Sequence, residues 1–164
     1  MINLNKFFFL VIICMAFYLS AIAKDNPEKI TRLTKKADII LTGKVTHKQS
    51  NWNESKTRIY TKTTIQVNEF LKGKASGNSV EVVYPGGEVG EVGELYTHMP
   101  TFENNEEVLV FLKKDKKKKG YQVLDGEEGK IKILKEGNSN VKVSASSSSI
   151  EDIKSQIKNI VKKQ

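Results

Sequence analysis

Histidine can act as a metal ligand or as an acid–base catalyst. The spacing of the histidines in this chain argues against a metal site. His47 and His98 are the two histidines, whereas catalytic zinc usually needs three protein ligands, two of them close together on one element. The two residues lie far apart, and the sequence holds no His-Glu-x-x-His segment. We therefore expect no metal site and no cofactor.

Covalent catalysis has no better support. The single cysteine, Cys14, lies in an apolar N-terminal run, and no Gly-x-Ser-x-Gly segment presents a serine for attack. The glycines Gly86, Gly87, Gly90 and Gly93 fit neither the phosphate-binding loop nor the dinucleotide-binding pattern. No pair of carboxylates stands in an apolar segment that would raise a pKa. The sequence thus predicts no catalytic residue and a protein that is not an enzyme.

Aromatic and sulfur-containing side chains gather in the segment Tyr96–Phe102. Such residues are over-represented at interfaces, and nearby glycines let a backbone come close to a partner. We therefore expect a binding surface on the loops Pro85–Gly93 and Tyr96–Phe102. The alternative is that the second loop is a buried lid of the fold. The candidate binding residues are Tyr84, Gly86, Gly87, Tyr96, His98, Met99, Pro100 and Phe102.

The elements that must position these loops are mostly strands. In 38–47 and 58–71 apolar or small residues alternate with polar ones, which is the period of a half-buried strand. The continuous apolar run in 107–112 indicates the best-buried strand, and 48–56 is expected to be a polar loop. Shorter strands are predicted at 80–84, 121–124, 130–134 and 141–144.

Six or seven strands joined by short turns favour an antiparallel barrel. A short helix is predicted to open at Pro27, and a second over about 149–163, where Ser148 and Glu151 form a capping box. The isoleucines of this second helix are expected to pack on the barrel, the alternative being contact with a bilayer surface. The predicted fold is a mainly β protein, a small OB-like antiparallel barrel with a helix at each end.

The N-terminus predicts export. A basic head is followed by the apolar run 7–23, which closes on Ala21-Ile22-Ala23 before Lys24, the pattern of a cleavable signal peptide. The alternative is a retained membrane anchor. Cleavage leaves one domain, 24–164, without a cysteine and without a transmembrane segment. We expect it to be a monomer in the periplasm or secreted.

Basic charge is concentrated in the run 113–119, in a chain whose formal net charge is +8. One interpretation is a solvated turn that prevents edge-to-edge aggregation, and the other is contact with an anionic component of the cell envelope. Nucleic acid is not expected as a partner. The partner is predicted to be an unknown protein or an anionic envelope component.

One combination of segments is distinctive: Ala37–Val45, Tyr60–Val67, Leu71–Gly73, Pro85–Gly87 with Gly90 and Gly93, Pro100 with Phe102, Glu107–Leu112, Gly120-Tyr121 and Gly129–Ile131. Together these segments, which cover about 36–134, resemble a family of uncharacterised secreted bacterial proteins. In some relatives of that family the module stands ahead of a matrixin-like metalloprotease domain. More distantly, the first strand and the Leu-Lys-Gly strand end are similar to the netrin-like OB-fold of tissue inhibitors of metalloproteinases.

The resemblance implies an OB-like fold and a role beside proteases. The inhibitors chelate the protease metal with an N-terminal cysteine, which the chain beginning at Lys24 does not have, so that route of inhibition is excluded. The leading hypothesis is an exported, non-enzymatic binding module. The alternatives are a protease inhibitor or protease-associated module and, third, a hydrolase with an unrecognised site.

Overall fold

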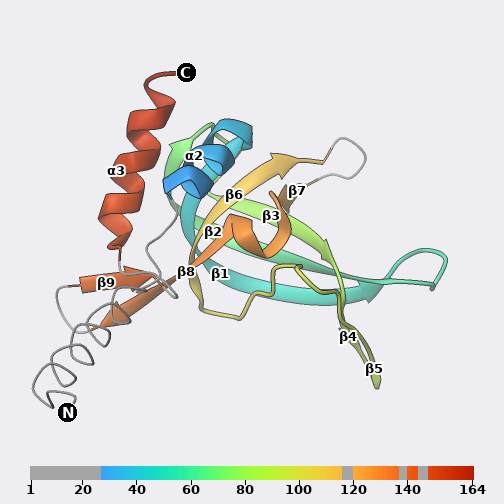
Figure 1. Cartoon of the computed structure of the whole chain (residues 1–164). Coiled ribbons are helices and arrows are strands. Elements are labelled where there is room, and N and C mark those ends of the chain that lie inside the picture. The colour runs from blue at the N-terminus through green and yellow to red at the C-terminus, as the bar shows by residue number, and fades with distance from the viewer. Residues whose placement is uncertain (1–26, 116–119, 137–139, 144–147) are drawn as a thin grey trace, which may run out of the picture.

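A computed structural model describes residues 27–115, 120–136, 140–143 and 148–164 (Figure 1). The expected signal peptide and most of the lysine run lie outside these residues. No helix in the described part is long and apolar enough to cross a membrane. The elements in chain order are α2 (Pro27–Lys36), β1 (Ile39–Trp52), β2 (Ile59–Lys72), β3 (Ser79–Pro85), β4 (Gly87–Val89), β5 (Val92–Glu94), β6 (Glu107–Lys114), β7 (Tyr121–Val123), the 3-10 turn η1 (Gly126–Gly129), β8 (Lys130–Glu136), β9 (Asn140–Val143) and α3 (Ile150–Val161).

Five strands close into a barrel in the order β1-β2-β3-β7-β6, with β6 pairing back to β1. All neighbours are antiparallel except β3 and β7, which run parallel where Val82 faces Tyr121. This order, with its single parallel pair, is that of an OB-like barrel, and the predicted fold class is confirmed. β8 and β9 continue the sheet from β6, and the β4–β5 hairpin projects from the barrel (Figure 1).

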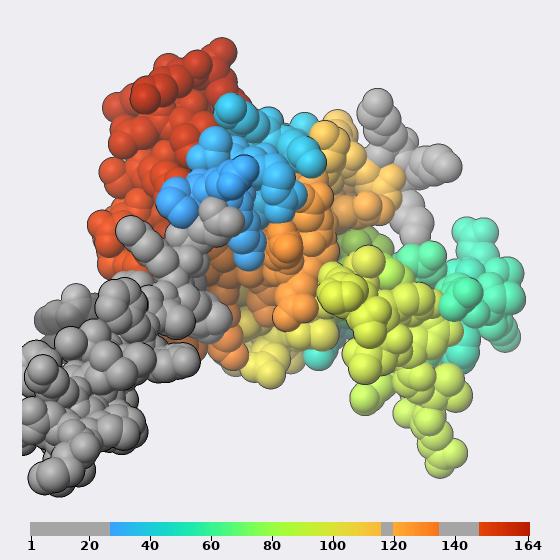
Figure 2. Space-filling model, viewed as in Figure 1, coloured from blue at the N-terminus to red at the C-terminus, as the bar shows by residue number. Residues whose placement is uncertain are grey.

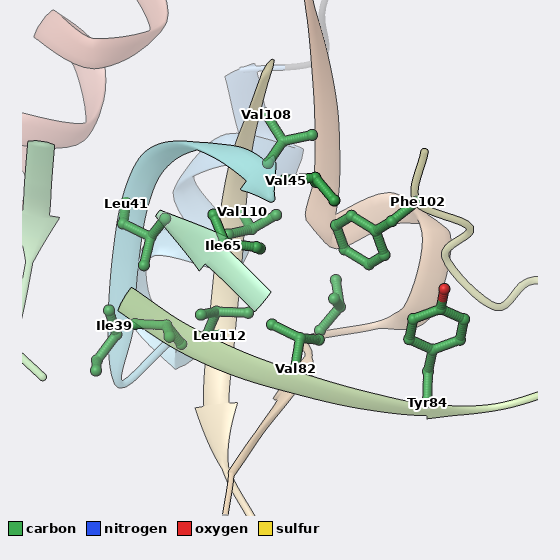
Figure 3. Close-up of a cluster of buried hydrophobic side chains, with 12 residues drawn as sticks. Ile39, Leu41, Val45, Ile65, Val82, Tyr84, Phe102, Val108, Val110 and Leu112 are labelled. Carbon is green, nitrogen blue, oxygen red and sulfur yellow. The ribbon is translucent and has the colours of Figure 1, made fainter. Parts of the chain in front are cut away.

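The core has two parts because β1 and β6 are buried on both faces. Alternate side chains, such as Leu41 and Val110, fill the barrel interior (Figure 3). The residues between them, such as Ile40 and Phe111, face outward and are covered by the two helices. The continuous apolar run of β6 follows directly from this burial on both sides.

Both helices pack on the outside of the barrel, on the same side (Figure 1). Ile153 and Ile157 of α3 join Ile30 and Leu33 of α2 in the outer core, so the isoleucine stripe packs on the barrel as expected. The predicted cap of α3 was wrong by one residue. Ser149 accepts a hydrogen bond from the N–H of Asp152, whose carboxylate accepts one from the N–H of Ser149. The box therefore starts one position later than Ser148.

The long hairpin of β1 and β2 corrects the expectation of a polar loop over 48–56. β1 continues to Trp52 because it pairs along its whole length with β2, and this pairing satisfies its backbone groups. Most of its polar side chains are exposed in this part, so polarity alone did not indicate a loop. The true turn is 53–58, where the Asn53 side chain accepts hydrogen bonds from the N–H groups of Thr57 and Arg58.

Candidate binding cleft

A cleft of about 700 Å³ lies between the β4–β5 hairpin, the end of β3 and the loop that follows β5. The β4–β5 hairpin projects from the body of the protein (Figure 2). Six of the eight candidate residues line this cleft: Tyr84, Gly86, Gly87, Tyr96, Met99 and Pro100. The fold therefore brings together residues from the two loops on which a binding surface was predicted.

Gly86 and Gly87 anchor the hairpin to the barrel. Their φ angles are 99° and 126°, a region that side chains disfavour and glycine adopts readily. Gly87 also leaves no room for a Cβ, which would overlap the hydroxyls of Ser50 and Thr61. The Thr61 hydroxyl donates to the Gly86 carbonyl at 2.6 Å. The two glycines thus fix the hairpin against β1 and β2 at the base of the cleft.

A hydrogen-bonded network holds Tyr96 at the wall of the cleft. Arg58 Nη1 donates to the Tyr96 hydroxyl at 2.7 Å, and this hydroxyl donates to Glu94 Oε2 at 3.0 Å. The same carboxylate oxygen accepts from the backbone N–H of Ile59 at 3.2 Å. The Arg58 guanidinium also lies over the Tyr96 ring, 5.9 Å from its centroid. Tyr96 is therefore positioned before any partner arrives.

Tyr84 lines the cleft and packs against Phe102 in the barrel core. Phe102 is 1% exposed and Tyr84 is 8% exposed. Their ring centroids are 5.6 Å apart (Figure 3). Burial raises the pKa of the Tyr84 phenol, and the neighbouring Thr63 and Thr61 hydroxyls and the Phe102 backbone oppose only part of this shift. Tyr84 therefore stays neutral at physiological pH, and Phe102 is a core residue outside the cleft lining.

His98 is not among the residues that line the cleft, and it is exposed, with φ 64°. Its carbonyl accepts a hydrogen bond from the N–H of Glu127 at 2.9 Å, which ties the loop to η1. His98 thus contributes a backbone anchor, and its imidazole is not among the groups that the fold brings together with Tyr96.

A buried ion pair holds the second half of the loop. Lys130 Nζ lies 2.8 Å from Glu106 Oε1, and their side chains are 13% and 3% exposed. The same ammonium donates to the Thr101 carbonyl and lies over the Phe102 ring, 4.7 Å from its centroid. Glu106 also accepts from the N–H of Glu103. The segment between β5 and β6 is therefore fastened at both ends.

Exposed apolar side chains are concentrated beside the cleft. Among the described residues, the large apolar side chains that are exposed are Val92, Leu95, Met99 and Leu134. Three of these four lie on β5 or on the loop after it, and Leu95 and Met99 line the cleft itself. Leu95 is 87% exposed. Clustering of this kind marks an interaction surface more often than scattered apolar residues do.

The segment Tyr96–Phe102 has both buried residues, as expected of a lid, and exposed residues that line the cleft. Phe102 is buried in the barrel core, whereas the buried Pro100 and the exposed Met99 both line the cleft. Exposed and buried residues alternate from Met99 to Phe102.

Three residues at the floor of the cleft were not among the predicted site residues: Lys48, Ser50 and Thr61. The first two fell in the segment expected to be a loop. A signal was available, because a predicted second strand of 58–71 needs an antiparallel partner of similar length. That requirement would have extended the first strand past residue 47 and placed Ser50 opposite Thr61.

Among the described residues, no three histidine, cysteine or acidic side chains come together in an arrangement that could hold a metal ion. No family model matches the sequence, and a search of curated proteins finds no match either. The resemblance to secreted bacterial proteins stays a prediction. The fold itself defines the class: a small OB-like barrel with a cleft at one end.

Proposed function

We propose that this chain is an exported binding module that holds an extended segment of a protein partner in the cleft. The observation that carries the proposal is the exposure of Leu95 and Met99 on the rim of a cleft whose walls are fixed by the Arg58–Tyr96–Glu94 network. A preorganised apolar surface binds with a smaller loss of conformational entropy than a mobile one.

A polypeptide suits this cleft better than a small anion. The lining mixes apolar side chains with Lys48, Glu88 and Glu94, so it offers no concentrated positive charge. The β4–β5 hairpin is a separate two-stranded sheet, and the outer edge of such a sheet can pair with an added strand. Leu95 and Met99 would then contact the side chains of the bound segment.

The partner is tested by site-specific photocrosslinking in the cells that make the protein. A benzophenone amino acid at Leu95 or at Met99 is expected to give one discrete protein adduct. The same probe at Leu134, which is exposed on β8, is the matched control and is expected to give none. The change Leu95→Ser should reduce the adduct from Met99 by tenfold or so, because an apolar anchor contributes about 1–2 kcal/mol. Equal adducts from all three positions, or none from the cleft, would contradict the proposal.

Export is tested separately. If the site after Ala23 is used, the N-terminus of the protein in the exported fraction is expected to be Lys24, because signal peptidase recognises small residues at positions −3 and −1. Intact-mass measurement of the purified protein reads this directly. In the variant Ala23→Leu, the uncleaved chain is expected to remain in the membrane fraction. A full-length chain in the cytoplasmic fraction would show that the N-terminus does not direct export.

A further inference from the structure

Lysine side chains gather at the end of the barrel opposite the cleft. The last turn of α2, the end of β2 with the residues after it, and the end of β6 meet there. We call this surface the basic end and define it by six residues: Lys35, Lys36, Lys72, Lys74, Lys113 and Lys114. Three segments that are distant in the sequence thus supply one surface.

Direct contacts hold the segments of the basic end together. Lys72 Nζ donates to the carbonyl of Thr34 at 2.7 Å, and Lys113 Nζ donates to the carbonyl of Lys36 at 3.4 Å. These carbonyls lie in the last turn of α2, where cations also interact favourably with the helix dipole. The end of α2 and the end of β6 are therefore side by side, as Figure 2 shows. Lys72 and Lys113 therefore contribute charge to this surface and also attach the end of α2 to β2 and β6.

The charge of the basic end is not neutralised within the described residues. The ion pairs that these residues form with one another lie elsewhere. Two carboxylates lie beside these segments, Asp38 just after α2 and Asp115 just after β6. Asp38 accepts a hydrogen bond from the backbone N–H of Lys114 at 2.9 Å, and Asp115 accepts one from the side-chain amide of Gln122 at 2.8 Å. The basic end thus has six ammonium groups and two carboxylates next to them.

Like charges are close enough to influence one another. Burial lowers the pKa of Lys72, Asp38 opposes this effect, and the positive charge of Lys113 adds to it. The five other lysines of the basic end are exposed. The fold keeps these charges together although their mutual repulsion is unfavourable, and an anionic partner would relieve that repulsion.

We propose that the basic end binds the surface of a bilayer that contains anionic phospholipids. Clusters of four to eight basic residues next to a membrane helix or on an amphipathic helix bind such surfaces, and the basic end is a cluster of that size. All six residues are lysines, which act as point charges and lack the bidentate geometry that arginine uses on a single phosphate. The large apolar side chains that are exposed in the described residues all lie elsewhere, so attraction here is electrostatic. This inference does not depend on what the cleft binds.

The test is cosedimentation of the mature protein with vesicles of phosphatidylcholine mixed with phosphatidylglycerol. Wild type is expected to bind these vesicles, to release them as salt is raised, and not to bind pure phosphatidylcholine. A variant carrying Lys35→Ser, Lys36→Ser, Lys74→Ser and Lys114→Ser removes four charges and keeps Lys72 and Lys113 on the carbonyls of α2. Its binding is expected to fall several hundred-fold, because each lysine near an anionic surface contributes about fivefold.

A matched control separates the basic end from net charge. The changes Lys44→Ser, Lys56→Ser, Lys162→Ser and Lys163→Ser remove four exposed lysines that do not belong to the basic end and are expected to weaken binding by less than about tenfold. Both variants leave residues 116–119 unchanged, and circular dichroism checks that both fold. Equal loss in the two variants, or no binding by wild type, would overturn the proposal. Tighter binding to single-stranded DNA than to the anionic vesicles, measured at the same salt, would overturn it as well.

Discussion

Replacing Phe102 with alanine is expected to lower the free energy of unfolding by about 3–5 kcal/mol, the usual cost of removing a fully buried phenylalanine. Phe102 is 1% exposed and lies against Tyr84 in the barrel interior and beneath the ammonium of Lys130. Truncation would leave a cavity at the point where the loop closes the barrel. Urea denaturation with linear extrapolation measures the change.

Met99→Ala is the control for this prediction, because Met99 lies in the same loop but is 37% exposed. Its truncation is expected to cost less than about 1 kcal/mol, since exposed positions rarely cost more. The comparison also shows which variant is suitable for partner studies: Met99→Ala probes the cleft, whereas Phe102→Ala damages the fold. Similar stability of the two variants would mean that the loop does not pack on the core as described.

Lys130→Met is expected to lower the free energy of unfolding by about 3 kcal/mol. The change keeps an apolar chain over Phe102 but leaves the Glu106 carboxylate, 3% exposed, without its closest cation. Breaking a buried pair by removing one partner is costly because the remaining charge stays desolvated. The loss is expected at the low end of the usual range, since Lys132 lies 3.8 Å from the same carboxylate. Thermal and urea unfolding both report it.

The double variant Glu106→Gln with Lys130→Met tests the effect of leaving the buried Glu106 carboxylate without its cation. It is expected to be at least about 1 kcal/mol more stable than Lys130→Met alone, because no buried carboxylate remains. The account would be contradicted if the loss of stability in the double variant equalled the sum of the losses in Glu106→Gln and Lys130→Met. Such additivity would indicate that both side chains act through packing.

Those parts of the fold that depend on local pattern were predictable from the sequence. The apolar run of β6 indicated burial on both faces, which the barrel core and the outer helices provide. Alternation in β2 placed Ile59 and Ile65 on the inner face, and both are fully buried. Apolar residues that recur every two or every 3.6 residues can be recognised in the sequence, and they mark the buried face of a strand or a helix.

Features that depend on which segments meet were not predictable in the same way. The floor of the cleft requires the register that sets Ser50 opposite Thr61, and register is fixed by pairing over the whole hairpin. The capping box of α3 differed by one residue because Ser148 and Ser149 are both suitable capping residues. The basic end arises from a helix end and two strand ends, and no local pattern in α2, β2 or β6 reveals their convergence.

β1 connects the two ends of the barrel. This one strand of 14 residues runs from the basic end to the floor of the cleft. Between Ile40 and Ser50 it can rise by up to about 33 Å, at about 3.3 Å per residue. The electrostatic field of a charged bilayer decays over about 10 Å at moderate salt. A molecule attached through its basic end would therefore hold its cleft beyond the reach of that field, where a partner of either charge could approach unhindered by the lipid.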